Sequence, residues 1–188
     1  MDTREKLSSI TITLHWIVGV LMLYMVMSGL FMEDIGIQWL FDSHTSFGVA
    51  ILLVVIPRVI WRYSNGWPEH AGDYTQFEKI SGKAVHWALL IATLLMPLSG
   101  MMMAIGGGHG LHFFSFDLLA ATSDPANSGE NLVIYPLLDD IGDTIHSFIG
   151  ETFLPAAIIL HIVGALKHHL IDKDRTLLRM LGLSLIHI

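Results

Sequence analysis

Two histidines, His146 and His161, stand inside one apolar segment near the C-terminus. Their spacing corresponds to about 22 Å of α-helix, which is most of the hydrocarbon thickness of a bilayer. Two more, His15 and His44, lie near opposite ends of two other apolar segments. Ionisable side chains at membrane depth are costly, and they usually face a bundle interior where they have a function. The residues best suited to chemistry therefore form two tiers of imidazoles, one near each side of a membrane.

Two tiers of paired imidazoles match the needs of two b-type haems, because each such haem takes two axial imidazoles at one depth on facing helices. The outer tier offers His44 and His146, and the inner tier offers His161 with either His15 or His86. On an ideal helix His146 and His161 lie about 60° apart, so one helix can present both to the bundle interior. We expect two haem b groups in the bundle.

Hydrogen bonding, zinc binding and transport are the alternative roles for these histidines. Any one of them alone could equally serve as an interhelical hydrogen-bonding residue. Zinc would favour four ligands drawn together rather than pairs about 20 Å apart. A haem-free transporter would need polar or broken helices around a midplane site, of which these segments show little. The chain has no cysteine, which excludes disulfides, iron–sulfur clusters and covalent haem attachment through C-x-x-C-H.

Four apolar segments must position the histidines. The chain is 53% hydrophobic and only 14% charged, whereas a soluble domain carries about a quarter charged residues. We predict an all-α fold: one integral-membrane four-helix bundle domain over residues 1–188, with two b haems in its interior. The stretch from Leu111 to Ala121 is too short to span, and we expect it at the membrane interface or over the bundle. The spans are predicted at 10–32, 44–63, 84–105 and 145–166.

Charge predicts the orientation. All ten Lys and Arg residues lie outside 7–57 and 84–166, in the two terminal regions and the link between the second and third spans. The positive-inside rule makes this side cytoplasmic, so we expect both termini in the cytoplasm of a bacterial inner membrane. Nucleic-acid binding is not indicated, since there is no basic stripe. The opposite side carries nine carboxylates without a cationic partner: Glu33, Asp34, Asp42, Asp117, Asp124, Glu130, Asp139, Asp140 and Asp143.

Several motifs occur in a characteristic order. They are His15-Trp16 early in the first span, His44 opening the second, Arg58 and Arg62 closing it, His86 eleven residues before Pro97, and the run His161-Ile-Val-Gly-Ala-Leu-Lys-His168-His169. Together they resemble the bacterial cytochrome b561 family, which includes superoxide oxidases and the cytochrome b subunits of hydrogenases and formate dehydrogenases. The similarity covers nearly the whole chain, and the four-span size suits the stand-alone members.

The resemblance implies a set of ligands. The family pairs its first helix with its fourth at the inner haem, and its second with its fourth at the outer haem. This gives His15 with His161 and His44 with His146, and leaves His86 as a quinone-site, propionate or alternative-ligand residue. The fourth span departs from the family in its spacing of fifteen residues, where fourteen is expected. Either Pro155 marks an inserted residue or one ligand is misassigned.

The function that follows is electron transfer between a donor and the quinone pool. Two alternatives are a superoxide:ubiquinone oxidoreductase and a membrane-anchor electron-transfer subunit of a dehydrogenase. The partners would be quinone and either a soluble redox donor or superoxide, although an acidic outer face slows the encounter with an anion. Four cationic residues could neutralise haem propionates or simply anchor the helices in the membrane: Arg58, Arg62, Lys83 and Lys167.

Overall fold

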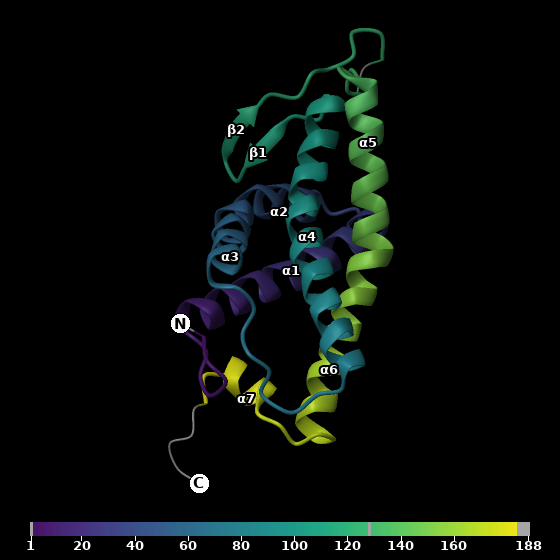
Figure 1. Cartoon of the computed structure of the whole chain (residues 1–188). Helices are drawn as coiled ribbons and strands as arrows, with labels where there is room; N and C mark the ends of the chain where they lie inside the picture. The colour runs from purple at the N-terminus through teal and green to yellow at the C-terminus, as the bar shows by residue number, and fades with distance from the viewer. Residues whose placement is uncertain (1, 128, 184–188) are drawn as a thin grey trace.

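The computed structural model describes residues 2–127 and 129–183, which form an elongated helical bundle (Figure 1). Four helical segments are long and apolar enough to cross a membrane: Ser9–Ile35, Gln38–Asn65, Gln76–Gly106 and Pro136–Leu170. Each contains one predicted span and extends beyond it at both ends. The predicted all-α, membrane-spanning fold class is therefore confirmed, while residues 1, 128 and 184–188 of the predicted domain lie outside the described residues.

The helices and strands follow the order of the labels in Figure 1. The first span is one helix, the second is a pair joined through Ile51, and the fourth is a continuous rod of three parts. In chain order the elements are α1 (Ser9–Ile35), α2 (Gln38–Ala50), α3 (Leu52–Asn65), α4 (Gln76–Gly106), β1 (Leu111–Phe113), β2 (Phe116–Leu119), α5 (Pro136–Ser147), the π-helical turn η1 (Phe148–Phe153), α6 (Leu154–Leu170) and α7 (Thr176–Met180).

Polar residues set the ends of the two longest uninterrupted helices. The Ser8 side chain accepts a hydrogen bond from the Thr11 N–H and so starts α1, which ends at Gly36 with a left-handed φ of 66°. Thr75 and Glu78 form a capping box at the start of α4. These caps satisfy backbone N–H groups that a helix cannot pair internally, so both helices begin at defined residues.

The fourth span contains a wide turn between its two histidines. Residues Phe148–Phe153 form a π-helix immediately before Pro155, which has no N–H to offer the preceding turn. A single π turn accommodates one extra residue without breaking the helix. His146 and His161 are then about 40° apart around the axis, as they would be in an ordinary helix with a spacing of fourteen. The π turn therefore gives the two histidines the angular relation expected for a spacing of fourteen.

The four spans meet in a small buried core. α4 lies along the rod of α5, η1 and α6 (Figure 1). Where α4 crosses α5 the two backbones approach so closely that a Cβ on Gly142 would lie 2.8 Å from the Met103 nitrogen. Most other apolar side chains of the spans point outward, as expected for helices surrounded by lipid. The core residues come from all four spans: Val18, Met22, Ile51, Val55, Ala92, Ile149 and Leu154.

The short apolar stretch after α4 is a β-hairpin. β1 and β2 pair antiparallel, and β1 packs on α2. The backbone N–H of Phe114 donates to the Ser46 hydroxyl at 2.9 Å, and the Phe114 ring meets the Phe47 ring edge-on at 5.3 Å. The hairpin therefore lies over the bundle, against the half of the second span that carries His44, which is one of the two locations expected for this stretch.

At the opposite end, residues 2–8, 58–83 and 167–183, which hold all ten Lys and Arg residues, form what we call the basic end. Trp16 of α1 donates through Nε1 to the Met180 carbonyl at 2.7 Å, which holds α7 against the first span. The Tyr74 hydroxyl donates to Asp174 at 2.6 Å. Burial and this hydrogen bond raise the pKa of Tyr74 to about 12. The two chain ends and the link between the second and third spans are thus tied into one structure.

The contact between α4 and α5 gives a test of the packing. Gly142→Ala should lower the free energy of unfolding by about 1–3 kcal/mol, because the added Cβ would meet the α4 backbone. Gly164→Ala in the same rod is the matched control, since nothing lies within 4 Å of its Cβ position. That change should be neutral or stabilise the helix by up to about 1 kcal/mol. Thermal unfolding followed by circular dichroism compares them; equal stability of the two variants would contradict the described crossing.

Candidate functional site

The outer tier brings together His44 of α2 and His146 of α5. Their ring centroids are 6.2 Å apart and their planes cross at 78°. His44 is buried and His146 is half-buried. The structure thus places side by side the two histidines that the sequence analysis assigned to the outer pair.

A serine and a glycine on α1 hold His44. The Ser28 hydroxyl lies 2.8 Å from His44 Nδ1 and itself donates to the Met25 carbonyl at 3.1 Å, so it accepts its hydrogen bond from the imidazole. A Cβ on the next residue, Gly29, would lie 3.1 Å from His44 Cε1. The serine therefore orients the ring and the glycine leaves room for it.

The same arrangement recurs on α4 around His146. The imidazole Nδ1 lies 3.0 Å from the Met96 carbonyl and 3.2 Å from the Ser99 hydroxyl. A Cβ on Gly100 would lie 3.0 Å from His146 Cε1. Because a carbonyl can only accept, Nδ1 must carry the proton. In both outer histidines the Nε2 nitrogen is then the one with a free lone pair, as a metal ligand requires.

The inner tier contains three histidines. The His161 ring centroid on α6 lies 5.9 Å from that of His15 on α1 and 5.3 Å from that of His86 on α4. His86 is also stacked on Trp67, with centroids 5.3 Å apart and planes only 20° from parallel. The structure therefore leaves His161 close to both of the inner partners that the sequence had left open.

Comparison with known proteins identifies the family. The family model described as prokaryotic cytochrome b561 matches residues 6–183. The chain belongs to the prokaryotic cytochrome b561 family. The family predicted from the histidine and tryptophan motifs is therefore confirmed. The chain is a membrane b-type cytochrome that takes part in electron transfer.

Three curated relatives cover almost the entire chain. Cytochrome b561 homolog 2 of Escherichia coli K12 is 26% identical over 189 residues, covering 97% of this chain and 95% of its own length. Probable superoxide oxidase CybB of Yersinia pestis is 26% identical over 184 residues, covering 95% and 97%. Cytochrome b561 homolog 1 of E. coli K12 is 28% identical over 182 residues, covering 94% and 97%.

The paired histidines fit the b-type haem that the cytochrome b561 family binds. Metal–imidazole bonds are about 2 Å long and the ring centre lies about 1.1 Å beyond the nitrogen, so two imidazoles on one iron have centroids about 6 Å apart. The separations of 6.2 Å for His44 with His146 and 5.9 Å for His15 with His161 agree with this value. The separation of 5.3 Å for His86 with His161 is shorter. His15 thus stands at the separation expected for a shared iron, and His86 stands closer to His161 than that.

The cations of the cytochrome b561 bundle differ in their partners. Lys167 pairs with Glu78 and with Asp172, and Arg62 pairs with Asp2 at 3.5 Å. Arg58 joins no ion pair among the described residues and lies close enough to the inner histidines to act on them electrostatically. Lys83 also joins no ion pair among the described residues, so Arg58 is distinguished by its closeness to the inner histidines alone.

Sequence reasoning missed three parts of this site. The serine–glycine pairs were one, although the repeat of Ser28-Gly29 and Ser99-Gly100 in two different spans was a usable signal. Trp67 was another, because nothing in the sequence links a loop tryptophan to a histidine of α4. Its indole Nε1 is buried without a hydrogen-bond partner in the described parts of the chain, and the Arg62 guanidinium lies 5.0 Å from its ring centroid. The third was the π turn.

The serine contacts predict an asymmetry between the outer histidines. Ser28→Ala removes the acceptor for His44 Nδ1, which makes the imidazole a weaker donor to iron and should raise the midpoint potential of the outer haem by tens of millivolts. Ser99→Ala is the matched control, because the Met96 carbonyl still accepts from His146. A spectroscopic redox titration compares the variants. Equal shifts in both, or none in Ser28→Ala, would contradict this reading of the hydrogen bonds.

Proposed function

We propose that this cytochrome b561 carries two b haems and moves electrons between a donor and the quinone pool of a bacterial inner membrane. The donor would act at the acidic end, by which we mean the side of the bundle that carries the nine carboxylates from Glu33 to Asp143 listed above. The observation that carries the proposal is the pair of histidines His146 and His161 on one rod, each facing a histidine from another span at a separation that suits a shared iron. One helix thereby links the two tiers.

The protein residues define what kind of redox site this would be. Haem b supplies a one-electron couple when it is bound. His44 and His146 would together hold a haem iron, and an iron held by two imidazoles would transfer electrons rather than bind oxygen. Ser28 and the Met96 carbonyl hold the two rings in the tautomer that presents Nε2. His15 and His161 would hold the inner haem, without such hydrogen bonds among the described residues.

The quinone half of the proposal rests on His86 of α4, which stacks on Trp67 of the basic end. Reduction of a quinone to a quinol takes two electrons and two protons, so its site must lie near the inner haem and near water. His86 is exposed, lies next to His161 and stacks on Trp67. An imidazole in this position can hydrogen-bond a quinone carbonyl and pass a proton to it. We assign His86 to the quinone site rather than to the iron.

Orientation follows from the same charge pattern as before. The segregation of every Lys and Arg supports both termini and the basic end on the cytoplasmic side. A C-terminal alkaline phosphatase fusion should accordingly be inactive in cells. A fusion to the hairpin residues 114–116 is the positive control and should be active. An active C-terminal fusion would contradict the proposed orientation.

Histidine variants test the haem assignment. The purified protein should contain two haems per chain by pyridine haemochrome assay, all extractable with acid acetone. His44→Ala or His146→Ala should leave one haem and remove one spectral component, and His15→Ala should remove the other. His86→Ala should keep both, as should the control His70→Ala in a loop. One haem or none in the unaltered protein would refute the proposal, and loss of the inner haem in His86→Ala would reassign its ligand.

A second candidate is oxidation of superoxide, which is favoured by the name of one relative, probable superoxide oxidase CybB. Superoxide would give one electron to the outer haem and leave as oxygen. The charge of this chain works against a fast encounter, because superoxide is an anion. Of the nine carboxylates at the acidic end, seven are exposed: Glu33, Asp34, Asp42, Asp117, Glu130, Asp140 and Asp143.

Salt dependence separates the two candidates. Repulsion is screened by salt, so reduction of the outer haem by pulsed superoxide should be slow and should speed up a fewfold as ionic strength rises to about 0.2 M. The same preparation should pass electrons from its reduced haems to ubiquinone. Near-diffusion-limited reduction that slows with added salt would establish superoxide as the donor. If no quinone tested oxidised the reduced haems, the proposal that quinone is the electron acceptor would be wrong.

A further inference from the structure

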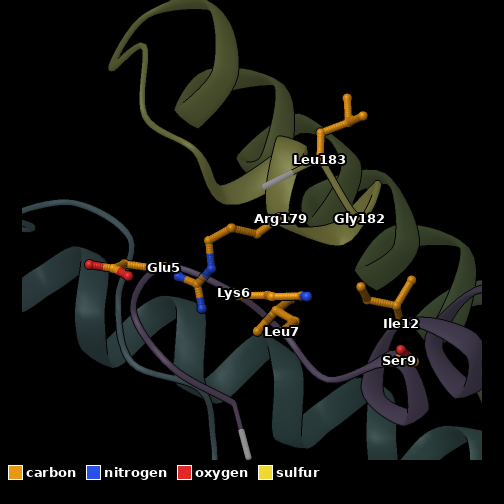
Figure 2. A pocket seen from close by; sticks show the side chains of 8 residues that line it. All are labelled: Glu5, Lys6, Leu7, Ser9, Ile12, Arg179, Gly182 and Leu183. Carbon is orange, nitrogen blue, oxygen red and sulfur yellow. The ribbon is translucent and has the colours of Figure 1, made fainter. Parts of the chain in front are cut away.

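A pocket of about 210 Å³ lies at the basic end, between the N-terminal segment and the residues that follow α7 (Figure 2). Lys6 and Arg179 supply its positive charge, and Glu5 is the one carboxylate in its lining. Its apolar wall includes Leu7, Ile12 and Leu183. None of these residues belongs to the histidine tiers, so the haem site does not account for the pocket.

Arg179 is unusually buried for a charged residue. Only 6% of its surface is exposed. Figure 2 shows its side chain reaching from α7 to the N-terminal segment. Nη1 donates to the Glu69 carbonyl at 3.0 Å and Nη2 to the Thr3 carbonyl at 2.8 Å. Nε is buried and has no partner within residues 2–127 and 129–183. Asp2 and Asp174 lie close enough to act on the guanidinium as charges, but neither accepts a hydrogen bond from it among the described residues. The buried Nε–H is therefore the group that still needs an acceptor.

Lys6 adds a second charge beside it. Its side chain is exposed, and in the described part of the chain it joins no ion pair, whereas Arg4 nearby pairs with Asp73 at 3.2 Å. Two cations and a single carboxylate leave the pocket with a net positive charge. Arginine and lysine together are the residues that proteins use to bind phosphate oxygens.

The position of the pocket narrows the source of the phosphate. α1 enters its membrane-spanning stretch at Ser9, and Ile12 lies one turn further along it. Trp16, one turn deeper, is bonded to the Met180 carbonyl. The cations of the pocket therefore sit at the level of lipid headgroups, and its apolar wall continues toward the hydrocarbon. Basic pockets at this level bind the headgroups of anionic lipids.

We infer that this pocket binds a phosphate-bearing anion between Lys6 and Arg179, and that its usual occupant is an anionic phospholipid of the adjacent leaflet with its first acyl carbons against Ile12 and Leu183. The inference is independent of the number of haems and of the electron donor.

Lipid titration of the full, haem-loaded protein tests it. Native mass spectrometry would give dissociation constants for dioleoyl phosphatidylglycerol and dioleoyl phosphatidylcholine, and calorimetry would give that for inorganic phosphate. Phosphatidylglycerol should bind more tightly than phosphatidylcholine. Lys6→Gln should weaken it about fivefold, the usual effect of one cation at a membrane surface. Lys173→Gln is the matched control, because Lys173 is exposed at the same end but does not line the pocket.

Each outcome has a defined meaning. Specific weakening in Lys6→Gln supports the site, and a similar loss of inorganic phosphate would assign it to free anions as well as lipid. Equal binding of the two lipids, or equal weakening in Lys6→Gln and Lys173→Gln, would overturn the proposal in favour of general surface charge. Arg179→Lys keeps the charge but loses the two hydrogen bonds of the guanidinium fork. Circular dichroism checks that this variant folds, and its binding of phosphatidylglycerol should be weaker than that of the unaltered protein.

Discussion

The architecture depends on a requirement of neutral imidazole: a buried histidine that offers one nitrogen to a metal must have its other nitrogen satisfied. In the outer tier this requirement is met from outside the helices that carry the histidines. α1 supplies Ser28 to His44, and α4 supplies the Met96 carbonyl to His146. The packing of α1 on α2 and of α4 on α5 therefore also orients the two outer imidazoles, because separating either pair of helices would free an imidazole nitrogen.

The outer and inner tiers differ in how their histidine rings are held in place. Both outer histidines are fixed by hydrogen bonds and by glycines that allow the rings to approach. Among the described residues, His15, His86 and His161 have no comparable hydrogen bond and contact mainly aromatic rings. The inner tier has three imidazoles, whereas one haem iron takes two. This surplus is why we assign His86, which stacks on Trp67, to the quinone rather than to the iron.

The sequence alone predicted the spans, the two tiers and the family, because apolar length, charge segregation and histidine depth are properties of single segments. It left the choice between His15 and His86 open, since that choice depends on how helices far apart in sequence approach each other. Ser28, Gly29 and Trp67 were missed for the same reason. The spacing of fifteen residues was evident in the sequence, but only the backbone shows that a π turn lies between the two histidines.

The distance between the tiers also has an energetic consequence for a cell. His146 and His161 lie about 20 Å apart along a helix that crosses about 30 Å of hydrocarbon. An electron passing from one tier to the other therefore traverses roughly two thirds of the membrane potential. In the proposed orientation it moves toward the negative side, against about 1.5 kcal/mol for each 100 mV. Electron flow through this cytochrome would thus be electrogenic, and the haem potentials must differ enough to overcome that load.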